Sequence, residues 1–469
     1  MDSEGRRMET VSLNVQHGEP CLVFPAEKTK EELYYLSNLD QNLALMVRTI
    51  YCYKATSFQK NESAAELIRK SLEKVLVPYY PLAGRLTICS DCKLAVKCNE
   101  GVLFVEAEAN CPLEELGDIT APDALVLNKL VPDVHASTSV LQRPLLMTQQ
   151  YYASGKLVSL VPTFEYAVSD YRYVYLETAT SKKYDVTKFK CGGFVLGLSV
   201  NHCMCDGVAA MEFVNSWGEM ARGLPLSVPP FLDRTILKPR SPLKTMYNHV
   251  EFSEVPLKTT EPCEDVIYAS FNFSPDKLAE LKKKAVNYDH FNQSCTTFQA
   301  LSALIWRTRT FALNLHPDQE TKLVFAVDVR SRMNPPLPKG YFGNGIVLAS
   351  SLGKVGELIN NPLSYAVKLV QESIDTVTDD FIKSVIDYLE VSRGRPSLSS
   401  TLVITTWTKL ALHAMDFGWG QPALSWPVGL PEKEVAMLLP DGPDRKGINV
   451  YLGLPSSAMK AFQELIKLH

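Results

Sequence analysis

The sequence predicts an α/β fold built from two lobes of similar size. An apolar run from Gly193 to Val200 has the length and composition of a buried strand. A helical pattern over 208–217 follows it directly, and a strand that passes into a helix is the repeating unit of α/β folds. A proline-rich stretch, 224–242, then divides the 469-residue chain nearly in half and has the composition of a semi-extended linker.

Other segments fit this fold class. Ser63-Ala64-Ala65-Glu66 has capping-box spacing and opens a helix that Pro78 and Pro81 end. Further predicted elements are strands over 87–107 with a turn at 99–101, a helix over 296–313, a strand over 322–329, and a C-terminal helix with Met459, Phe462 and Ile466 on its apolar face and Ser456 or Ser457 as its cap.

Composition places the chain among folded proteins. It is 46% hydrophobic and 21% charged, with a net charge of −4, and its densest basic run, 282–284, fits the wet face of a helix, so we expect no nucleic-acid partner. Residues 1–19 have no signal-peptide core, and no stretch approaches the ~18 apolar residues of a membrane helix. Eleven irregularly spaced cysteines fit free thiols in a reducing compartment, so we expect a cytoplasmic protein.

The densest cluster of reactive side chains is His202-Cys203-Met204-Cys205-Asp206-Gly207. It lies at the predicted strand-to-helix junction, where α/β folds present side chains to ligands. An imidazole with a pKa of about 6.5 can accept a proton near neutrality and return it, so His202 is a candidate general base, the alternative being a core histidine. Asp206 either orients His202 or ties the turn to a distant arginine, which we favour, and Gly207 lets the backbone turn.

The cysteines do not indicate a metal site. Cys203 and Cys205 flank one methionine, and zinc sites use C-x2-4-C spacing with a second pair, which is missing here. Cys89 and Cys92, with Cys98 nearby, fall in a predicted hairpin. Buried or half-buried thiols are the simpler interpretation, and we expect no metal.

Two other motifs need interpretation. Residues 416–420 read Asp-Phe-Gly-Trp-Gly, but the other protein-kinase signatures are missing, so a tight, aromatic-packed turn is the better interpretation. Arg330 and Arg332 close a predicted strand and would face the same side of it. One could pair with a buried carboxylate and the other could meet a phosphate.

Taken together, the motifs resemble one family. HCMCDG (202–207), DFGWG (416–420), YPLAGRL (80–86), VDVRSRM (327–333) and YFGN (341–344) occur in an order and at separations that make the whole chain resemble the BAHD family of plant acyl-CoA-dependent acyltransferases. The resemblance implies two chloramphenicol-acetyltransferase-like lobes, each a mixed β-sheet flanked by helices, with a central channel between them. The lobes would span 1–223 and 243–469, joined by the linker 224–242, with about 401–426 crossing back to complete the first.

The resemblance also implies roles for individual residues. His202 matches the catalytic base, and Asp206 matches an aspartate that points away from substrate and pairs with an arginine, here Arg330. Thr406 and Trp407 match channel residues that could stabilise the oxyanion. Acyl-CoA would be the co-substrate, with no permanent cofactor and no covalent intermediate, and Arg332 is a candidate CoA contact. Gly207 and the DFGWG turn would be structural, the latter comprising Asp416, Phe417, Gly418, Trp419 and Gly420.

Three stretches, 34–41, 395–398 and 427–431, look like the omega-hydroxy fatty acid and fatty alcohol hydroxycinnamoyltransferases, which serve suberin, cutin or wax formation. The predicted reaction therefore moves a feruloyl or caffeoyl group from CoA to a long-chain aliphatic hydroxyl.

Alternatives stay open at this point. Shikimate or quinate would need an arginine such as Arg393 or Arg395, and polyamines would need carboxylates such as Asp379, Asp380 or Asp387, which more simply fit helix surfaces. A non-catalytic scaffold has no need for a base, and a serine hydrolase would need a G-x-S-x-G elbow. The polar stretch 166–190 fits a surface insertion or a loop that caps the channel. We expect a monomer.

Overall fold

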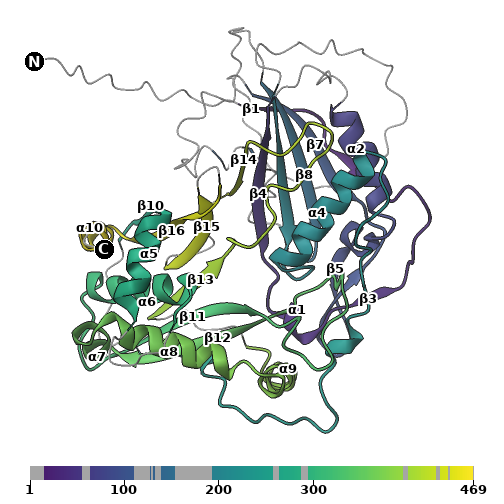
Figure 1. The fold of residues 1–469 in the computed structure, drawn as a ribbon. Helices are drawn as coiled ribbons and strands as arrows, with labels where there is room; N and C mark the ends of the chain where they lie inside the picture. Colours follow the sequence, from purple (N-terminus) through teal and green to yellow (C-terminus); the bar gives the residue numbers. More distant parts are fainter. Residues whose placement is uncertain are drawn as a thin grey trace, which may run out of the picture.

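The computed structural model describes residues 15–54, 64–109, 127, 130–131, 139–153, 193–256, 264–286, 294–394, 400–428, 434–441 and 444–467. These residues form two large mixed sheets side by side, each with helices on its outer face (Figure 1). The predicted α/β class is therefore confirmed.

The first sheet has the order β1-β7-β8-β9-β4-β14, with β2 also beside β7. All neighbours are antiparallel except β7 and β8. Its strands are β1 (Val15–His17), β2 (Cys21–Val23), β4 (Met46–Tyr53), β7 (Val102–Ala109), β8 (Leu146–Ala153), β9 (Phe194–Asn201) and β14 (Leu424–Pro427). The edge strand β14 comes from the C-terminal half of the chain and pairs with β4.

The second sheet has the order β10-β16-β15-β13-β11-β12, and β13 runs parallel to both of its neighbours. Its strands are β10 (Val266–Phe273), β11 (Glu320–Asp328), β12 (Ile346–Lys354), β13 (Thr401–Thr406), β15 (Val435–Asp441) and β16 (Gly447–Pro455). A small third sheet, β3-β6-β5, joins Leu33–Tyr35, Leu94–Lys97 and Arg85–Ile88.

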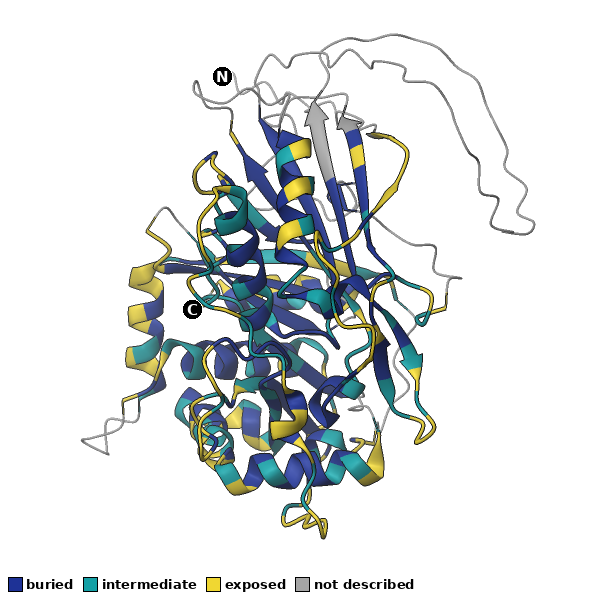
Figure 2. Cartoon of the chain, turned by 90° about the vertical axis from the view of Figure 1, so that its right-hand side faces the viewer, coloured by how far each residue is buried: buried dark blue, intermediate teal, exposed yellow. Residues whose placement is uncertain are grey.

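Helices α2 (Ala64–Val75) and α4 (Gly207–Ala221) cover the first sheet. The helices of the second half are α5 (Pro275–Ala285), α6 (Thr297–Ala312), α7 (Val355–Asn360), α8 (Leu363–Thr376), α9 (Asp379–Ser392) and α10 (Ser456–Ile466). Short helical turns are α1 (Asn38–Gln41), η2 (Tyr80–Ala83), η4 (Arg234–Leu237) and η5 (Val250–Phe252). The exposed residues of the longer helices lie on solvent-facing stripes, as expected for amphipathic helices (Figure 2).

Most sequence-predicted elements have the expected type. Thr296 caps α6 through a reciprocal capping box with Gln299. Asn99 and Gly101 both have positive φ at the turn between β6 and β7. The predicted cap of the C-terminal helix is wrong, because Pro455 holds the cap position while Ser456 and Ser457 donate to the Glu264 carboxylate. Ser63 of the predicted capping box and the stretch 166–190 lie outside the described residues.

Two apolar layers position the site. One lies between the first sheet and helices α2 and α4. The other joins the opposite face of that sheet to the second sheet, where Ile50 and Trp426 meet Met437 and Tyr451. Among the described residues no helix has the length and apolar character needed to cross a bilayer. The lobe boundaries taken from the sequence stay a prediction.

Candidate active site

His202 occupies the turn between β9 and α4 and lines a cavity of about 260 Å³. Its backbone N–H donates to Leu45 O at 2.8 Å, which anchors the turn to the neighbouring β4 side of the sheet. Its Nδ1 atom is buried and has no hydrogen-bond partner among the described residues. The His202 imidazole therefore faces the cavity, and no carboxylate or carbonyl of the described residues binds its Nδ1 atom.

The cavity lies where the first sheet, the start of α4 and three strand ends of the second sheet meet. Its walls are largely apolar, and Lys409 is the only cation among the described residues that line it. The lining residues are Val47, Thr49, Tyr51, Leu198, Val200, His202, Cys205, Asp206, Gly207, Val208, Ala210, Met211, Ala326, Asp328, Ile346, Thr405, Thr406, Trp407, Lys409, Leu410 and Leu412.

Asp206 is a buried N-cap whose two carboxylate oxygens are both occupied. Oδ1 accepts the N–H of Ala209 at 3.1 Å and a guanidinium N–H of Arg330 at 2.9 Å. Oδ2 accepts the second guanidinium N–H of Arg330 and the N–H of Gly345, each at 2.8 Å. This bidentate pair is the one that the resemblance implied. Four donors leave the carboxylate no free lone pair directed at His202.

Arg330 and Arg332 do not lie on an extended strand end, and this sequence expectation was wrong. Strand β11 ends at Asp328 and the chain turns, with the N–H groups of Arg332 and Met333 both donating to Val329 O. The Arg330 and Arg332 side chains therefore need not face the same side, as they would on an extended strand. Arg330 points to Asp206; burial lowers the arginine pKa, but the charges and hydrogen bonds of Asp206 and Asp328 together outweigh burial and raise it.

Arg332 is exposed and does not line the described cavity. It donates to Ile374 O at 3.0 Å and Val377 O at 2.9 Å, at the C-terminal end of α8. Its guanidinium thus binds two carbonyls at the helix end, of which that of Ile374 also accepts the backbone N–H of Val377. A CoA contact for Arg332 stays a prediction.

Thr406 is the last residue of β13 and Trp407 follows it, and both line the cavity. The Thr406 hydroxyl lies 2.9 Å from that of Thr408, and the backbone N–H of Trp407 donates to Leu438 O at 2.8 Å. Gly207 lies close to this segment, and a Cβ there would lie 2.7 Å from Leu410 Cδ1, so the leucine side chain would have to move.

The DFGWG turn lies at the other end of α4. Asp416 Oδ1 accepts the N–H groups of Gly418 at 2.7 Å and Gly420 at 2.8 Å, and both glycines have positive φ. Phe417 packs edge-on against Trp217, and Trp419 packs edge-on against Phe194. None of the five residues lines the described cavity, which fits the structural role expected for them.

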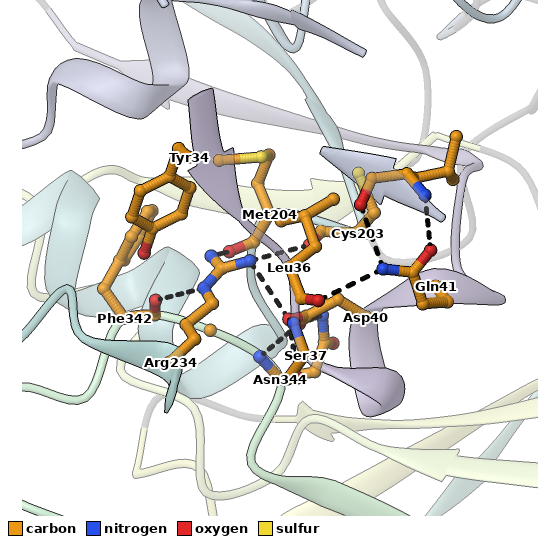
Figure 3. Close-up of polar contacts among 12 residues, drawn as sticks. Tyr34, Leu36, Ser37, Asp40, Gln41, Cys203, Met204, Arg234, Phe342 and Asn344 are labelled. Atoms are coloured by element: carbon orange, nitrogen blue, oxygen red, sulfur yellow. Dashed lines mark hydrogen bonds and ion pairs between the residues drawn. The ribbon is translucent and has the colours of Figure 1, made fainter. Parts of the chain in front are cut away.

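A second buried ion pair lies behind the His202 turn and was not found from the sequence (Figure 3). Arg234, in the presumed linker, is 1% exposed and pairs with Asp40, which is 0% exposed, at 3.2 Å. Its guanidinium also donates to the carbonyls of Cys203, Met204 and Phe342. Asn344 completes the group by donating to Asp40 Oδ1 and to His202 O, each at 2.8 Å.

Sequence signals for this group were present but ambiguous. Asp40 and Asn344 belong to the stretches 34–41 and 341–344, which carry the resemblance to known enzymes but assign no role to either residue. Arg234 lies in a proline-rich segment, where a solvated charge is the ordinary expectation. The segment is thus a partly buried connection rather than a plain spacer.

The cysteines of the described region are free thiols. Burial raises the pKa of both Cys203 and Cys205 above the ordinary thiol value. No group of three or more His, Cys, Asp and Glu side chains within the described ranges has the arrangement of a metal site.

Comparison with known proteins places the chain in a family. Residues 13–170 and 182–468 match the model of the Transferase family. An omega-hydroxypalmitate O-feruloyl transferase of Arabidopsis thaliana is 51% identical, covering 99% of this chain and 95% of that protein. A fatty alcohol:caffeoyl-CoA acyltransferase of the same plant is 49% identical, covering 98% and 100%.

The fold is shared with a solved structure. The crystal structure of vinorine synthase superposes with a TM-score of 0.72, at 22% identity, covering 97% of this chain and 98% of that one. Motif order, family match and fold agree, so the chain belongs to the Transferase family, that of the BAHD acyltransferases.

Proposed function

We propose that the protein transfers a feruloyl or caffeoyl group from CoA to the hydroxyl of a long-chain omega-hydroxy fatty acid or fatty alcohol. The observation that carries this proposal is a histidine presented to a mostly apolar cavity, in a chain about half identical over its full length to two enzymes named for such reactions. An aliphatic acceptor suits walls formed by Val47, Leu198 and Val200.

His202 is the proposed general base. An alcohol is a weak nucleophile at neutral pH, so His202 takes its proton as the oxygen attacks the thioester carbonyl. The new C–O bond gives a tetrahedral oxyanion, for which Thr406 and Trp407 are the proposed donors. The C–S bond then breaks, and the proton held by His202 passes to the departing CoA sulfur. The apolar walls limit the water that could take the place of the alcohol.

Asp206 has a supporting role in this proposal. Its oxygens are filled by Arg330, Ala209 and Gly345, so it fixes the turn and the start of α4 rather than the imidazole. Arg330 and Gly207 belong to the same support, and the DFGWG turn supports the far end of α4.

Tyr51 offers recognition of a phenolic donor. Its hydroxyl is buried, lines the same cavity and has no well-aligned hydrogen-bond partner among the described residues. Burial raises the Tyr51 pKa to about 12, an effect that Thr49 only partly offsets, so the group stays protonated. A buried hydroxyl in an apolar wall, with only a poorly aligned contact to Thr49, is suited to the ring hydroxyl of a feruloyl or caffeoyl group.

None of the residues considered for other acceptors that the structure describes lines the cavity. Arg393 is exposed and donates to Asp91 O, and Arg395 lies outside the described residues. Asp379 pairs with Lys383. Asp387 is not the surface charge expected from the sequence, because it is 0% exposed and pairs with Arg240. These residues give no support to shikimate, quinate or polyamine acceptors.

The test is release of CoA thiol from feruloyl-, caffeoyl-, coumaroyl- and acetyl-CoA. Each donor is offered 16-hydroxypalmitate, a long-chain alcohol, shikimate, quinate and spermidine. We expect turnover with the two aliphatic acceptors and a loss of at least about 10²-fold in kcat for His202→Ala. Turnover confined to shikimate or quinate would contradict the acceptor. Unchanged turnover in His202→Ala would contradict the base, and silence across the panel would favour a scaffold.

We also propose that the enzyme acts as a cytoplasmic monomer. The two sheets of one chain together line the cavity around His202, which suffices for activity, and the irregularly spaced cysteines fit a reducing compartment. Sedimentation equilibrium at micromolar concentration should give a mass near 52.3 kDa, and twice that mass would contradict the monomer.

A further inference from the structure

Three consecutive backbone carbonyls of the His202 turn are bound from behind. Asn344 Nδ2 donates to His202 O at 2.8 Å, and the Arg234 guanidinium donates to Cys203 O at 3.2 Å and to Met204 O. Figure 3 shows Arg234 between the Cys203 and Met204 carbonyls and Asp40, with Asn344 beside Asp40. The described cavity includes neither Arg234 nor Asn344.

We propose that Asn344 and Arg234, held by Asp40, are positioning residues that orient the His202 imidazole through its own peptide groups. This inference rests on the proposed function, because it concerns the base that function requires. None of the three residues touches the reacting atoms.

The need for such support follows from the imidazole itself. A catalytic histidine is commonly oriented by a hydrogen bond to the nitrogen that does not react. In His202 the buried Nδ1 has no such partner among the described residues. The peptide groups on both sides of its Cα are held instead, the N–H by Leu45 O and the C=O by Asn344.

Asp40 is the centre of the group. Its Oδ2 accepts the N–H and the hydroxyl of Ser37 at 2.7 and 2.6 Å. Its Oδ1 accepts the backbone N–H of Asn344 at 3.1 Å and the side-chain Nδ2 at 2.8 Å. Arg234 supplies the counter-charge; burial lowers its pKa, but Asp40, together with Tyr34, Tyr341 and Cys203, outweighs burial and raises the pKa.

The Asn344 amide has one chemically sensible orientation. Its nitrogen faces two acceptors, Asp40 Oδ1 and His202 O, so exchanging nitrogen and oxygen would place oxygen against oxygen. The amide therefore links the His202 carbonyl to the buried Asp40 carboxylate and holds that carbonyl in place.

The experiment compares Asn344→Ala with Asn449→Ala, in feruloyl-CoA turnover with a long-chain alcohol. Asn449 is 4% exposed and donates to the Asp441 carboxylate at 2.7 Å, but it lies in the second sheet and does not line the described cavity. We expect Asn344→Ala to lower kcat by about 10- to 100-fold, as for a slightly misplaced catalytic group, with little change in KM for the donor. Asn449→Ala should leave kcat unchanged.

A double-mutant cycle separates positioning from a merely structural role. If Asn344 acts through His202, then Asn344→Ala has no further effect on kcat in the His202→Ala background. Arg234→Lys keeps a cation beside Asp40 without the guanidinium fork, so it should lower kcat by less than Asn344→Ala does. This variant replaces Asn344→Ala in the cycle if Asn344→Ala fails to fold.

The outcomes are distinguishable. Full activity of a folded Asn344→Ala overturns the positioning role, and so do equal, additive losses of kcat in the parent and His202→Ala backgrounds. In either case the proposed function stands, provided that His202→Ala itself has a lowered kcat. Full activity of His202→Ala overturns the base on which this inference rests, whereas a parent enzyme that is silent with both aliphatic acceptors overturns the proposed function itself.

Discussion

Two aspartate–arginine pairs hold the same six-residue turn from two sides. Asp206 and Arg330 lie at the cavity side, and the Arg330 side chain is still 16% exposed. Asp40 and Arg234 lie behind the turn, and both side chains are 0% exposed. The first pair engages a side chain of the turn, whereas the second engages mainly its backbone carbonyls.

This difference explains why only one pair is visible in the sequence. A contact to a side chain demands a particular residue, so Asp206 forms part of a recognisable motif. A contact to a carbonyl accepts any residue at that position, so nothing in Cys203 or Met204 reveals Arg234. Sequence motifs record the side-chain contacts of a turn and omit the supports that act on its backbone.

The comparison predicts its largest effect for Arg234→Met. This change leaves the Asp40 carboxylate buried without its counter-charge, and it removes the donors to two turn carbonyls. We expect the free energy of unfolding to fall by about 3–5 kcal/mol, measured by urea denaturation. A loss below about 1 kcal/mol would show that the buried pair contributes no more than a surface pair does.

Arg330→Met should be less damaging, because Asp206 keeps the N–H groups of Ala209 and Gly345 and the site is partly solvated. We expect a loss of about 1–3 kcal/mol in the same measurement. Asp328→Asn is the matched control, since Asp328 is the more exposed partner of Arg330, and it should change stability by no more than about 0.5 kcal/mol. A loss in Arg330→Met as large as that in Arg234→Met would erase the distinction between the pairs.

Gly218→Ala tests the C-terminal end of α4, the helix that begins at the His202 turn. A Cβ at this position would lie 2.6 Å from Asp416 O, so the DFGWG turn must shift, at about 1–3 kcal/mol. Gly218 lies about 16 Å along α4 from Gly207, so kcat at a temperature where the variant is folded should match the parent. A drop in kcat with intact folding would indicate that the DFGWG turn also controls the His202 turn.

Tyr51→Phe should have the smallest effect on stability, since the hydroxyl loses only a poorly aligned contact to Thr49. We expect instead that the preference for feruloyl-CoA over cinnamoyl-CoA, which lacks the ring hydroxyl, falls by about 2- to 10-fold in kcat/KM. An unchanged preference would place the donor ring elsewhere in the cavity.

Long, strongly patterned elements could be predicted from sequence. The apolar run became β9, and the patterns at 208–217 and 296–313 became α4 and α6 with their caps. Periodicity reports the burial of a whole face, so it tolerates local exceptions. The predicted cap of α10 failed because Glu264, far away in the sequence, binds both serines.

The candidate site was predictable where side chains meet side chains. The Asp206–Arg330 contact was anticipated, but Arg332 and Asp387 were misjudged. Arg332 binds the end of a helix that only the folded chain brings near. Asp387 is buried because Arg240 covers it from a segment 147 residues earlier. Charges reveal their burial only through such distant partners.

The pairing of β14 with β4 has a consequence for synthesis on the ribosome. Leu424 pairs with Cys52, so one edge of the first sheet is closed by residues made about 370 positions later. At roughly 5–20 residues per second, the open edge of β4 waits on the order of 20–70 seconds for its neighbour. An unpaired strand edge is a template for aggregation during that time. Nascent chains of this protein should therefore depend on chaperones until almost the whole polypeptide has emerged.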